Sequence, residues 1–361
     1  MRLEKAFDRP FFGFRSILGW NHWRREVKTI LFGKTDRSFS DRLWCLKNGF
    51  ALSDLNLYGL DTLKQNKDDY LSLGDYYKLH PINGEYSFWI DDKITMKYVL
   101  SSFEQYLPDY YYQLEKKGIL RLHNCPAGSG EDVDSILVLL REKKTLALKR
   151  LWGSCGVGFY RLDYDENGYF INKKAATEDE VRKLLSSLYS YLVMEYVVNH
   201  HSIRDIWPDA TNTMRVLVAN CGGELVFMRT FIRFGNAKSN CVDNAHAGGI
   251  EAVIDEDTGN ILFTQAQDLY GHPTIIPHHP DSGVSFSIQI PHWKEVMGVV
   301  EEICRHFPQL RYMGFDVAVT EDGFKIIEIN SLSGLMAAQC KEPLLKDRKT
   351  RAVYEYFKQN K

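Results

Sequence analysis

The chain has 361 residues, enough for two or three structural lobes, and its 44% hydrophobic and 25% charged residues are ordinary for a soluble globular protein. A formal net charge of −2 excludes a global field that would recruit nucleic acid, and the seven scattered cysteines form no C-x-x-C pair, which argues against a zinc site or a disulfide framework. No apolar run reaches about 18 residues, so we expect no signal peptide or transmembrane helix, and we expect a cytoplasmic location.

The first 42 residues carry a local basic and aromatic bias. They contain ten Lys or Arg against five Asp or Glu, interleaved with phenylalanines and with Trp20 and Trp23. Such a segment is compatible with peripheral contact to a membrane surface or to a partner such as a glycosyltransferase. The alternative is a helical element whose aromatic side chains pack on the main body.

The next segments are predicted to be helical and irregular. A short helix begins at Ser40 and ends at Asn48 and Gly49. Another helix begins at Asp91 and is followed by a break at Pro108 and a tyrosine-rich turn.

A strand predicted over residues 145–149 leads directly into a glycine-rich stretch, residues 153–158. Glycines let a backbone approach phosphates closely, and Lys149 supplies a compact positive charge for phosphate oxygens. The stretch is not a P-loop, since the lysine precedes the glycines, and it is not a dinucleotide-binding fingerprint, since a strand follows it. A glycine-rich turn between two strands, without any phosphate, remains the alternative.

The following residues predict a compact α+β unit and then a strand-rich region. Two strands, residues 159–162 and 169–172, flank a turn, a T-x-x-E capping box at Thr177 opens a helix, and residues 191–198 form another strand. Residues 211–265 alternate strands with Gly or Asn turns, and residues 292–306 form an amphipathic helix.

A hairpin predicted over residues 314–334 carries three oxygen-bearing side chains at its open end. A three-residue loop, residues 321–323, would place Asp316 opposite Glu328, with Asn330 on the same face. Opposed carboxylates are unfavourable unless they share a cation or a proton, and Mg²⁺ takes such ligands. A two-residue Asp-Gly loop would put the two acids on opposite faces, and a solvated hairpin with ordinary surface acids is the other alternative.

In combination, these motifs resemble the ATP-grasp superfamily, and most closely its sugar-transfer-associated family, which is found beside genes for bacterial surface polysaccharides. The resemblance covers roughly residues 40–340. It rests on Asp92 and Lys93, Lys149 with residues 153–158, residues 211–215, 242–249, 279–283 and 290–293, and the hairpin from Gly314 to Asn330.

The resemblance implies a role for each matching position. Lys93 and Lys149 would hold the ATP phosphates beneath a mobile lid, residues 153–158, and the adenine would lie on a hinge. One or two Mg²⁺ ions would be bound by Asp316, Glu328 and Asn330. The expected cofactor-binding residues are Lys93, Lys149, Gly153, Ser154, Gly156, Gly158, Glu195, Tyr196 and Val197, and the expected acceptor-binding residues are Asn212, Asp243, Asn244, Gly248 and Gly249.

Two positions depart from the family pattern. Many ATP-grasp ligases carry an Arg where this chain has Gly314, so Arg215 and Arg229 become candidates for the missing charge, with Lys149 as the third catalytic candidate. Many relatives place an acidic residue for the ribose where this chain has Ser202. His200, His201 or Asp205 are the candidate substitutes, and the sequence does not choose among them.

The resemblance therefore predicts an α+β ATP-grasp fold with a mobile lid. The expected divisions are a mostly helical region over residues 1–142, a lid subdomain over 143–199 and a larger C-terminal subdomain over 200–361. The expected activity is an ATP- and Mg²⁺-dependent carboxylate–amine ligase that acts through an acyl-phosphate on small, possibly sugar-linked substrates in surface polysaccharide biosynthesis. A kinase on the same fold, phosphorylating a hydroxyl with Asp243 or His246 as its base, is the alternative.

Overall fold

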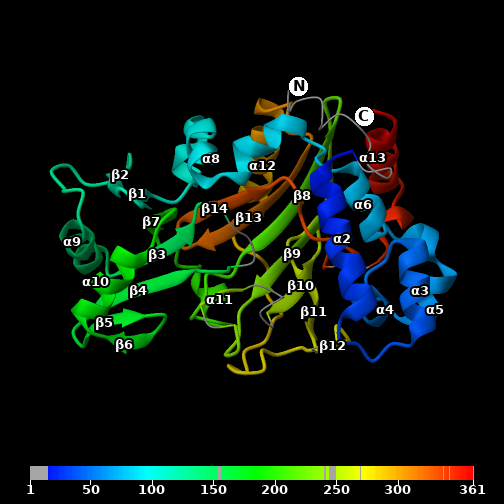
Figure 1. Ribbon diagram of the computed structural model, residues 1–361, viewed down its shortest axis with the longest axis horizontal. Coiled ribbons are helices and arrows are strands. Elements are labelled where there is room, and N and C mark those ends of the chain that lie inside the picture. The colour runs from blue at the N-terminus through cyan, green and yellow to red at the C-terminus, as the bar shows by residue number, and fades with distance from the viewer. Residues whose placement is uncertain are drawn as a thin grey trace.

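The computed structural model describes residues 15–152, 156–239, 241–243, 249–268, 270–335, 337–340 and 342–360. Its architecture is α+β, as predicted, and Figure 1 shows two sheets side by side with a group of helices at the far side of the larger one. Among the described residues, none of the helices combines the length and hydropathy that a membrane crossing needs.

The helical N-terminal region packs against the larger sheet. The helix predicted from Ser40 is confirmed: Ser38 caps it through a capping box with Asp41, and Gly49 ends it in the left-handed conformation. Trp23 packs on a small apolar cluster of this region, whereas Phe32 and Phe39 are 79% and 69% exposed. Its helices are α2 (Ile17–Phe32), α3 (Phe39–Asn48), α4 (Leu52–Leu57), α5 (Leu60–Gln65), α6 (Leu73–Leu79), α7 (Phe88–Asp91) and α8 (Lys93–Val99).

The smaller sheet has seven antiparallel strands in the order β2-β1-β7-β3-β4-β5-β6. Leu146 and Leu148 point into the core beneath two helices, whereas Ala147 and Lys149 face the other side. The strands are β1 (Tyr110–Glu115), β2 (Gly118–Arg121), β3 (Thr145–Arg150), β4 (Tyr160–Asp165), β5 (Gly168–Ile171), β6 (Lys174–Ala176) and β7 (Tyr191–Glu195), and the helices are α9 (Val133–Lys143) and α10 (Glu178–Ser187).

The tyrosine-rich turn predicted after Pro108 is wrong, because these residues form β1. Tyrosine favours strands, and this strand pairs with β2, which follows it directly, and with β7, some eighty residues later in the chain. The smaller sheet thus takes in strands on both sides of the boundary expected at residue 142. The chain enters this lobe at residues 107–109 and leaves it at residues 196–199, and the capping box at Thr177 opens α10 as predicted.

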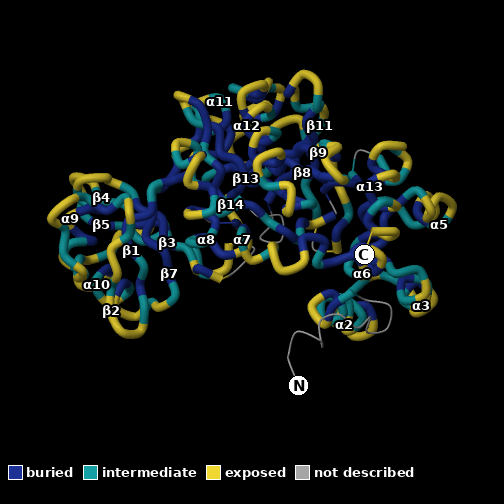
Figure 2. The backbone as a smooth tube through the Cα atoms, turned by 90° about the horizontal axis from the view of Figure 1, so that it is seen from above, coloured by how far each residue is buried: buried dark blue, intermediate teal, exposed yellow. Residues whose placement is uncertain are grey.

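The larger sheet also has seven antiparallel strands, in the order β12-β11-β10-β9-β8-β13-β14. One face packs on the predicted amphipathic helix α12 (Trp293–His306), and part of the other face packs on α6 and α13 (Arg348–Gln359). Figure 2 shows that β8 and β13, in the middle of this sheet, are buried along most of their length. The strands are β8 (Met214–Cys221), β9 (Glu224–Phe234), β10 (Ile250–Ile254), β11 (Ile261–Gln267), β12 (Pro273–Ile275), β13 (Tyr312–Thr320) and β14 (Gly323–Asn330), and the short helix α11 (His201–Arg204) precedes them.

The predicted pairing of Asp316 with Glu328 is confirmed, but the turn expected to produce it, with Thr320 opposite Phe324, is wrong. Thr320 pairs with Gly323, so the turn has two residues, and Gly323 adopts a φ of +148° that other residues rarely adopt. Asp316 nevertheless pairs with Glu328, because Val317 pairs with Ile326 and leaves Ile327 as an extra residue, a β-bulge. The bulge therefore restores the pairing that a three-residue loop would have given.

Candidate active site

A cleft lies between the two lobes, lined by β3 and β7 of the smaller sheet and by β9, β13 and β14 of the larger one. Its lining divides into two kinds of side chain. The apolar group comprises Ala147, Val157, Phe159, Met194, Val197 and Ile327, and the charged group comprises Lys93, Lys149, Arg233, Asp243, Asp316 and Glu328. A ligand with an apolar ring and a polyanionic tail matches such a cleft.

Two of the predicted lysines meet at the charged part of the cleft. Lys93 is buried at the start of α8, with its Nζ 3.5 Å from Glu328 Oε2. Lys149 projects from β3 and has no salt-bridge partner among the residues that the structure describes. Burial lowers the pKa of Lys149, and neighbouring Lys93 lowers it further, against the opposite effect of Glu328. The two cations are close enough to repel each other, and a bound anion would reduce this repulsion.

The three predicted metal ligands converge on the cleft side of the hairpin. The amide nitrogen of Asn330 lies 3.4 Å from Glu328 Oε1 and 3.5 Å from Asp316 Oδ2. These contacts are long, and exchanging the nitrogen and oxygen of the amide turns the Asn330 oxygen towards the carboxylates. Carboxylate and amide oxygens suit Mg²⁺, so the donor set fits this ion, with Glu328 and Asn330 as its most accessible members.

Asp316 also has strong protein partners of its own. Arg215 on the neighbouring strand β8 binds both of its carboxylate oxygens, and the Nη2 of Arg233 lies 3.1 Å from Oδ1. Burial by itself would raise the pKa of Asp316, but the two guanidinium groups outweigh it and hold the pKa well below its usual range. Asp316 is thus held in its charged form by these partners. Arg215, a predicted catalytic residue, uses its guanidinium to bind Asp316.

Arg233 is a cleft residue that the sequence analysis missed. It lies on β9 and contacts Asp316 and Asp243, with its Nε 3.6 Å from Asp243 Oδ2. This buried Nε has no hydrogen-bond acceptor among the described residues. The alternation of Arg229, Phe231 and Arg233 along one strand was the available signal, because it places two arginines on one face.

Arg229, the other predicted catalytic arginine, does not line the cleft. Its Nη2 lies 3.1 Å from Glu342 Oε1, and its Nη1 donates to the Met228 carbonyl oxygen. Phe231 separates it from Arg233 along the strand. The structure therefore brings Arg233, and not Arg229, to the charged part of the cleft.

The absence of an arginine at Gly314 has a steric cause. A Cβ atom at this position would lie 1.8 Å from Ser333 Oγ and 3.2 Å from a methyl group of Leu217. A side chain here requires the Ser333 hydroxyl to rotate away, and its Cβ would still lie 3.0 Å from the Ser333 Cβ, so the glycine is favoured by close packing. Arg233 offers a guanidinium next to the same carboxylate, Asp316.

We expect Gly314→Ala to lower the free energy of unfolding by about 1–3 kcal/mol, the usual cost of overpacking a core position. Equilibrium denaturation would measure the change. Removing the Ser333 hydroxyl in a Gly314→Ala/Ser333→Ala double variant should recover part of the loss. Equal stability of Gly314→Ala and the parent would contradict the steric explanation.

The predicted hinge residues lie beside the apolar part of the cleft. The Glu195 side chain accepts a hydrogen bond from the Asp109 N–H at 3.0 Å. This bond joins the segment that enters the smaller lobe to the segment that leaves it. Tyr196 stacks beneath the Arg161 guanidinium, 4.3 Å from the ring centroid, and its hydroxyl accepts from the same arginine. The Val197 carbonyl oxygen accepts from Thr211 Oγ1.

The predicted lid and acceptor-binding residues are described only in part. Gly153, Ser154, Asn244 and Gly248 lie outside the described residues, as does His246. Gly156 lines the cleft, and at its φ of +66° a Cβ atom would lie 2.9 Å from Val242 of the larger lobe, so the loop here touches the opposite wall. Gly158 also has a positive φ, of +77°, and Gly249 directly precedes β10.

Two of the predicted acceptor-binding residues are well defined. Asn212 is fully buried and structural: its amide donates to the Trp207 carbonyl oxygen and accepts from the Gly235 N–H. Asp243, in contrast, lines the cleft and accepts hydrogen bonds from the Thr213 N–H and hydroxyl. Burial raises the pKa of Asp243, although Arg233 opposes the shift.

Comparisons with known proteins identify the family of the chain. A family model described as sugar-transfer associated ATP-grasp matches residues 75–352, more than half of the chain. A search of curated proteins finds no significant match.

The chain is also similar to solved structures at low identity, which bears on the fold alone. One is D-alanyl-alanine synthetase A from Vibrio cholerae, with 12% identity over 75% of this chain and 65% of that chain, at a TM-score of 0.43. A second is the ATP-grasp ligase PsnB with minimal precursor, Mg and ADP, with 12% identity over 76% of this chain and 61% of that chain, at a TM-score of 0.38. A third is an L-amino acid ligase from Bacillus licheniformis, with 9% identity over 86% of this chain and 58% of that chain, at a TM-score of 0.39. The chain spans less than two thirds of the length of each.

Proposed function

Because the chain belongs to the sugar-transfer associated ATP-grasp family, we propose that it is an ATP- and Mg²⁺-dependent carboxylate–amine ligase. The observation that carries the proposal is the cleft, which sets an apolar slot beside Lys93, Lys149 and Arg233 and an oxygen-rich hairpin. The adenine of ATP would lie among Met194, Val197 and Ile327, and its phosphates would lie between the lysines.

The proposed reaction has two steps. An oxygen of the acceptor carboxylate attacks the γ-phosphorus of ATP, and the bond from this phosphorus to the β–γ bridging oxygen breaks, so that ADP leaves and an acyl-phosphate remains. An amine nitrogen then attacks the acyl carbon, and the carbon–oxygen bond to the phosphate breaks. Phosphate and a proton are released with the amide product.

The residues of the cleft supply positioning and charge. Lys93 and Lys149 would bind phosphate oxygens, and the guanidinium of Arg233, which also lines the cleft, would lie near the transferred group or the acceptor carboxylate. Glu328 and Asn330 would hold Mg²⁺, which supplies neutralisation of charge on the phosphate oxygens when bound. Closure of residues 156–158 over the cleft excludes water from the acyl-phosphate.

The substrates are proposed from the family description alone. A sugar-linked carboxylate, an amino acid or a precursor of a surface polysaccharide would fit a sugar-transfer association. Contact of residues 1–42 with a membrane surface or a glycosyltransferase stays a proposal, supported by the exposure of Phe32 and Phe39 next to basic side chains.

A kinase is the second candidate, and Asp243 is the observation that favours it. This carboxylate lines the cleft, and its raised pKa suits a group that accepts a proton from an attacking hydroxyl. Arg215, which a ligase would use to hold a carboxylate, is already bound to Asp316.

Hydroxylamine separates the two candidates. We expect the protein, incubated with ATP, Mg²⁺, hydroxylamine and a pool of uronic and amino acids, to produce a hydroxamate detectable by mass spectrometry, because hydroxylamine intercepts an acyl-phosphate. The mass of the hydroxamate would identify the acid. A stable phosphorylated product with ADP and no hydroxamate would overturn the ligase in favour of the kinase.

A further inference from the structure

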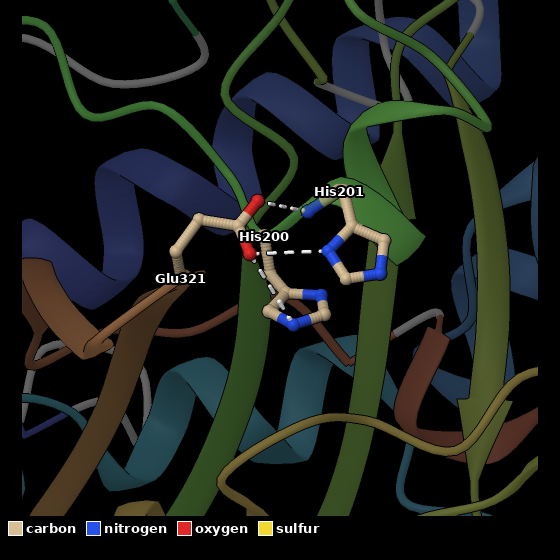
Figure 3. Close-up of side chains that lie close together, drawn as sticks. All are labelled: His200, His201 and Glu321. Atoms are coloured by element: carbon tan, nitrogen blue, oxygen red, sulfur yellow. Dashed lines mark hydrogen bonds and ion pairs between the residues drawn. The ribbon is translucent and has the colours of Figure 1, made fainter.

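A second polar cluster lies at the tip of the β13–β14 hairpin, away from the residues that line the cleft. It consists of His200, His201 and Glu321, and Figure 3 shows the two imidazoles turned towards one carboxylate. His200 and His201 begin α11, and Glu321 lies in the two-residue turn. The His200 N–H donates to the Val319 carbonyl oxygen, which joins the two segments.

The carboxylate of Glu321 is held in one orientation. Its Oε1 accepts a hydrogen bond of 2.8 Å from the His201 N–H. Its Oε2 then faces both imidazoles, 3.1 Å from His201 Nδ1 and 3.5 Å from His200 Nε2. The three atoms lie within 4.8 Å of one another.

These separations suit a tetrahedral metal ion. Bonds of roughly 2.0–2.1 Å place the ligand atoms of a tetrahedral centre about 3.3–3.4 Å apart. Two of the separations, 3.1 and 3.5 Å, bracket this value. Two imidazole nitrogens and one carboxylate oxygen favour Zn²⁺ and similar divalent ions over Mg²⁺, which prefers oxygen ligands.

Ser202 fixes the orientation of the His200 ring. Its N–H donates to His200 Nδ1 at 3.2 Å and its Oγ lies 2.9 Å from the same nitrogen, so Nε2 is the ring nitrogen that faces Glu321. The nearest competing cation is Arg204, 4.0 Å from the other oxygen, Oε1.

Solvent reaches the cluster from one side. The side chain of His201 is 59% exposed and that of Glu321 is 48% exposed, whereas that of His200 is 17% exposed. His292 contacts the backbone of the same turn, with its Nε2 3.2 Å from the Glu321 carbonyl oxygen. An ion between the three ligand atoms would therefore keep an open position towards water.

We propose that His200, His201 and Glu321 form a binding site for Zn²⁺ or a similar divalent transition metal, distinct from the Mg²⁺ ligands in the cleft. The ion ties the hairpin that carries Asp316 and Glu328 to the segment that directly follows Val197. Metal binding at the tip therefore stabilises the larger lobe next to the nucleotide cleft.

The test uses the untagged full chain without nucleotide. We expect Zn²⁺ to bind in isothermal titration calorimetry, and Co²⁺ to produce the visible absorption of a four-coordinate site. Glu321→Gln keeps an acceptor for the His201 N–H but weakens the metal ligand, and His201→Ala removes one imidazole. Each variant should lose at least about 10-fold in Zn²⁺ affinity, and the increase in melting temperature that Zn²⁺ gives the parent should disappear.

Two variants serve as controls. His272→Ala removes an imidazole that faces a single carboxylate, Asp36, and should leave Zn²⁺ affinity unchanged. Glu328→Gln alters the cleft and should also leave it unchanged, which separates this site from the proposed function. No Zn²⁺ binding to the parent, or equal affinity in the parent and both cluster variants, would overturn the proposal.

Discussion

Glu328→Ala is expected to lower Mg²⁺-dependent turnover by about 10²–10³-fold, the usual effect of removing a group that stabilises transition-state charge. Glu328 is the predicted metal ligand with the fewest protein partners: it lies 3.5 Å from Lys93 and 3.4 Å from Asn330. Its side chain is 26% exposed, but its removal leaves buried Lys93 without this carboxylate, so we expect the free energy of unfolding to fall by about 1–3 kcal/mol while the protein stays folded.

Two measurements check this expectation. ADP formation with the acid pool and hydroxylamine reports turnover, and calorimetric titration with ATP, with and without Mg²⁺, reports whether the ion still strengthens nucleotide binding. Glu302→Ala, on the exposed face of α12, is the matched control and should behave as the parent. Undiminished turnover together with an unchanged Mg²⁺ effect on ATP binding would remove Glu328 from the metal site.

Arg233→Met is expected to cost about 3–5 kcal/mol of unfolding free energy, because it leaves buried charges without a partner. Asp316 would keep only Arg215, and Asp243 would keep only the two hydrogen bonds from Thr213. The guanidinium lies within 3.6 Å of both carboxylates, and its side chain is 16% exposed. Denaturant unfolding would measure the loss.

A second substitution tests the electrostatic reason. Asp243→Asn neutralises one of the stranded carboxylates, so the Arg233→Met/Asp243→Asn double variant should be more stable than Arg233→Met alone. Arg229→Met is the matched control, since it removes an arginine four residues away on the same face of β9 whose partner, Glu342, is 40% exposed. Equal costs at the two arginines would contradict the assigned role of Arg233.

The family and the α+β ATP-grasp fold were predictable because they depend on local motifs in a fixed order. The capping box at Thr177, the strand before the glycine-rich stretch and the amphipathic helix over residues 292–306 are each defined by neighbours in sequence. Pairings between distant strands were not predictable in this way. β1 was mistaken for a turn although its hairpin partner β2 follows it directly, and only its other neighbour, β7, lies far along the chain.

The cleft shows the same limit at the level of single residues. Lys93, Lys149, Asp316 and Glu328 follow from motifs, and the structure brings all four to one place. Arg233 does not, because its position depends on two successive strand pairings, β9 with β8 and β8 with β13. The sequence made Arg215 and Arg229 equal candidates. The strand pairings place Arg215 beside Asp316 and Arg229 beside Glu342.

The bulge at Ile327 decides whether the two hairpin acids, Asp316 and Glu328, lie on the same face of the sheet. Because side chains alternate with period two, an even-numbered turn joined to regular strands would send Asp316 and Glu328 to opposite sides of the sheet. The bulge absorbs the odd residue between them and returns both acids to the cleft. If the extra residue were accommodated beyond Glu328 instead, Asp316 would pair with Ile327 and Glu328 would turn to the opposite face of the sheet.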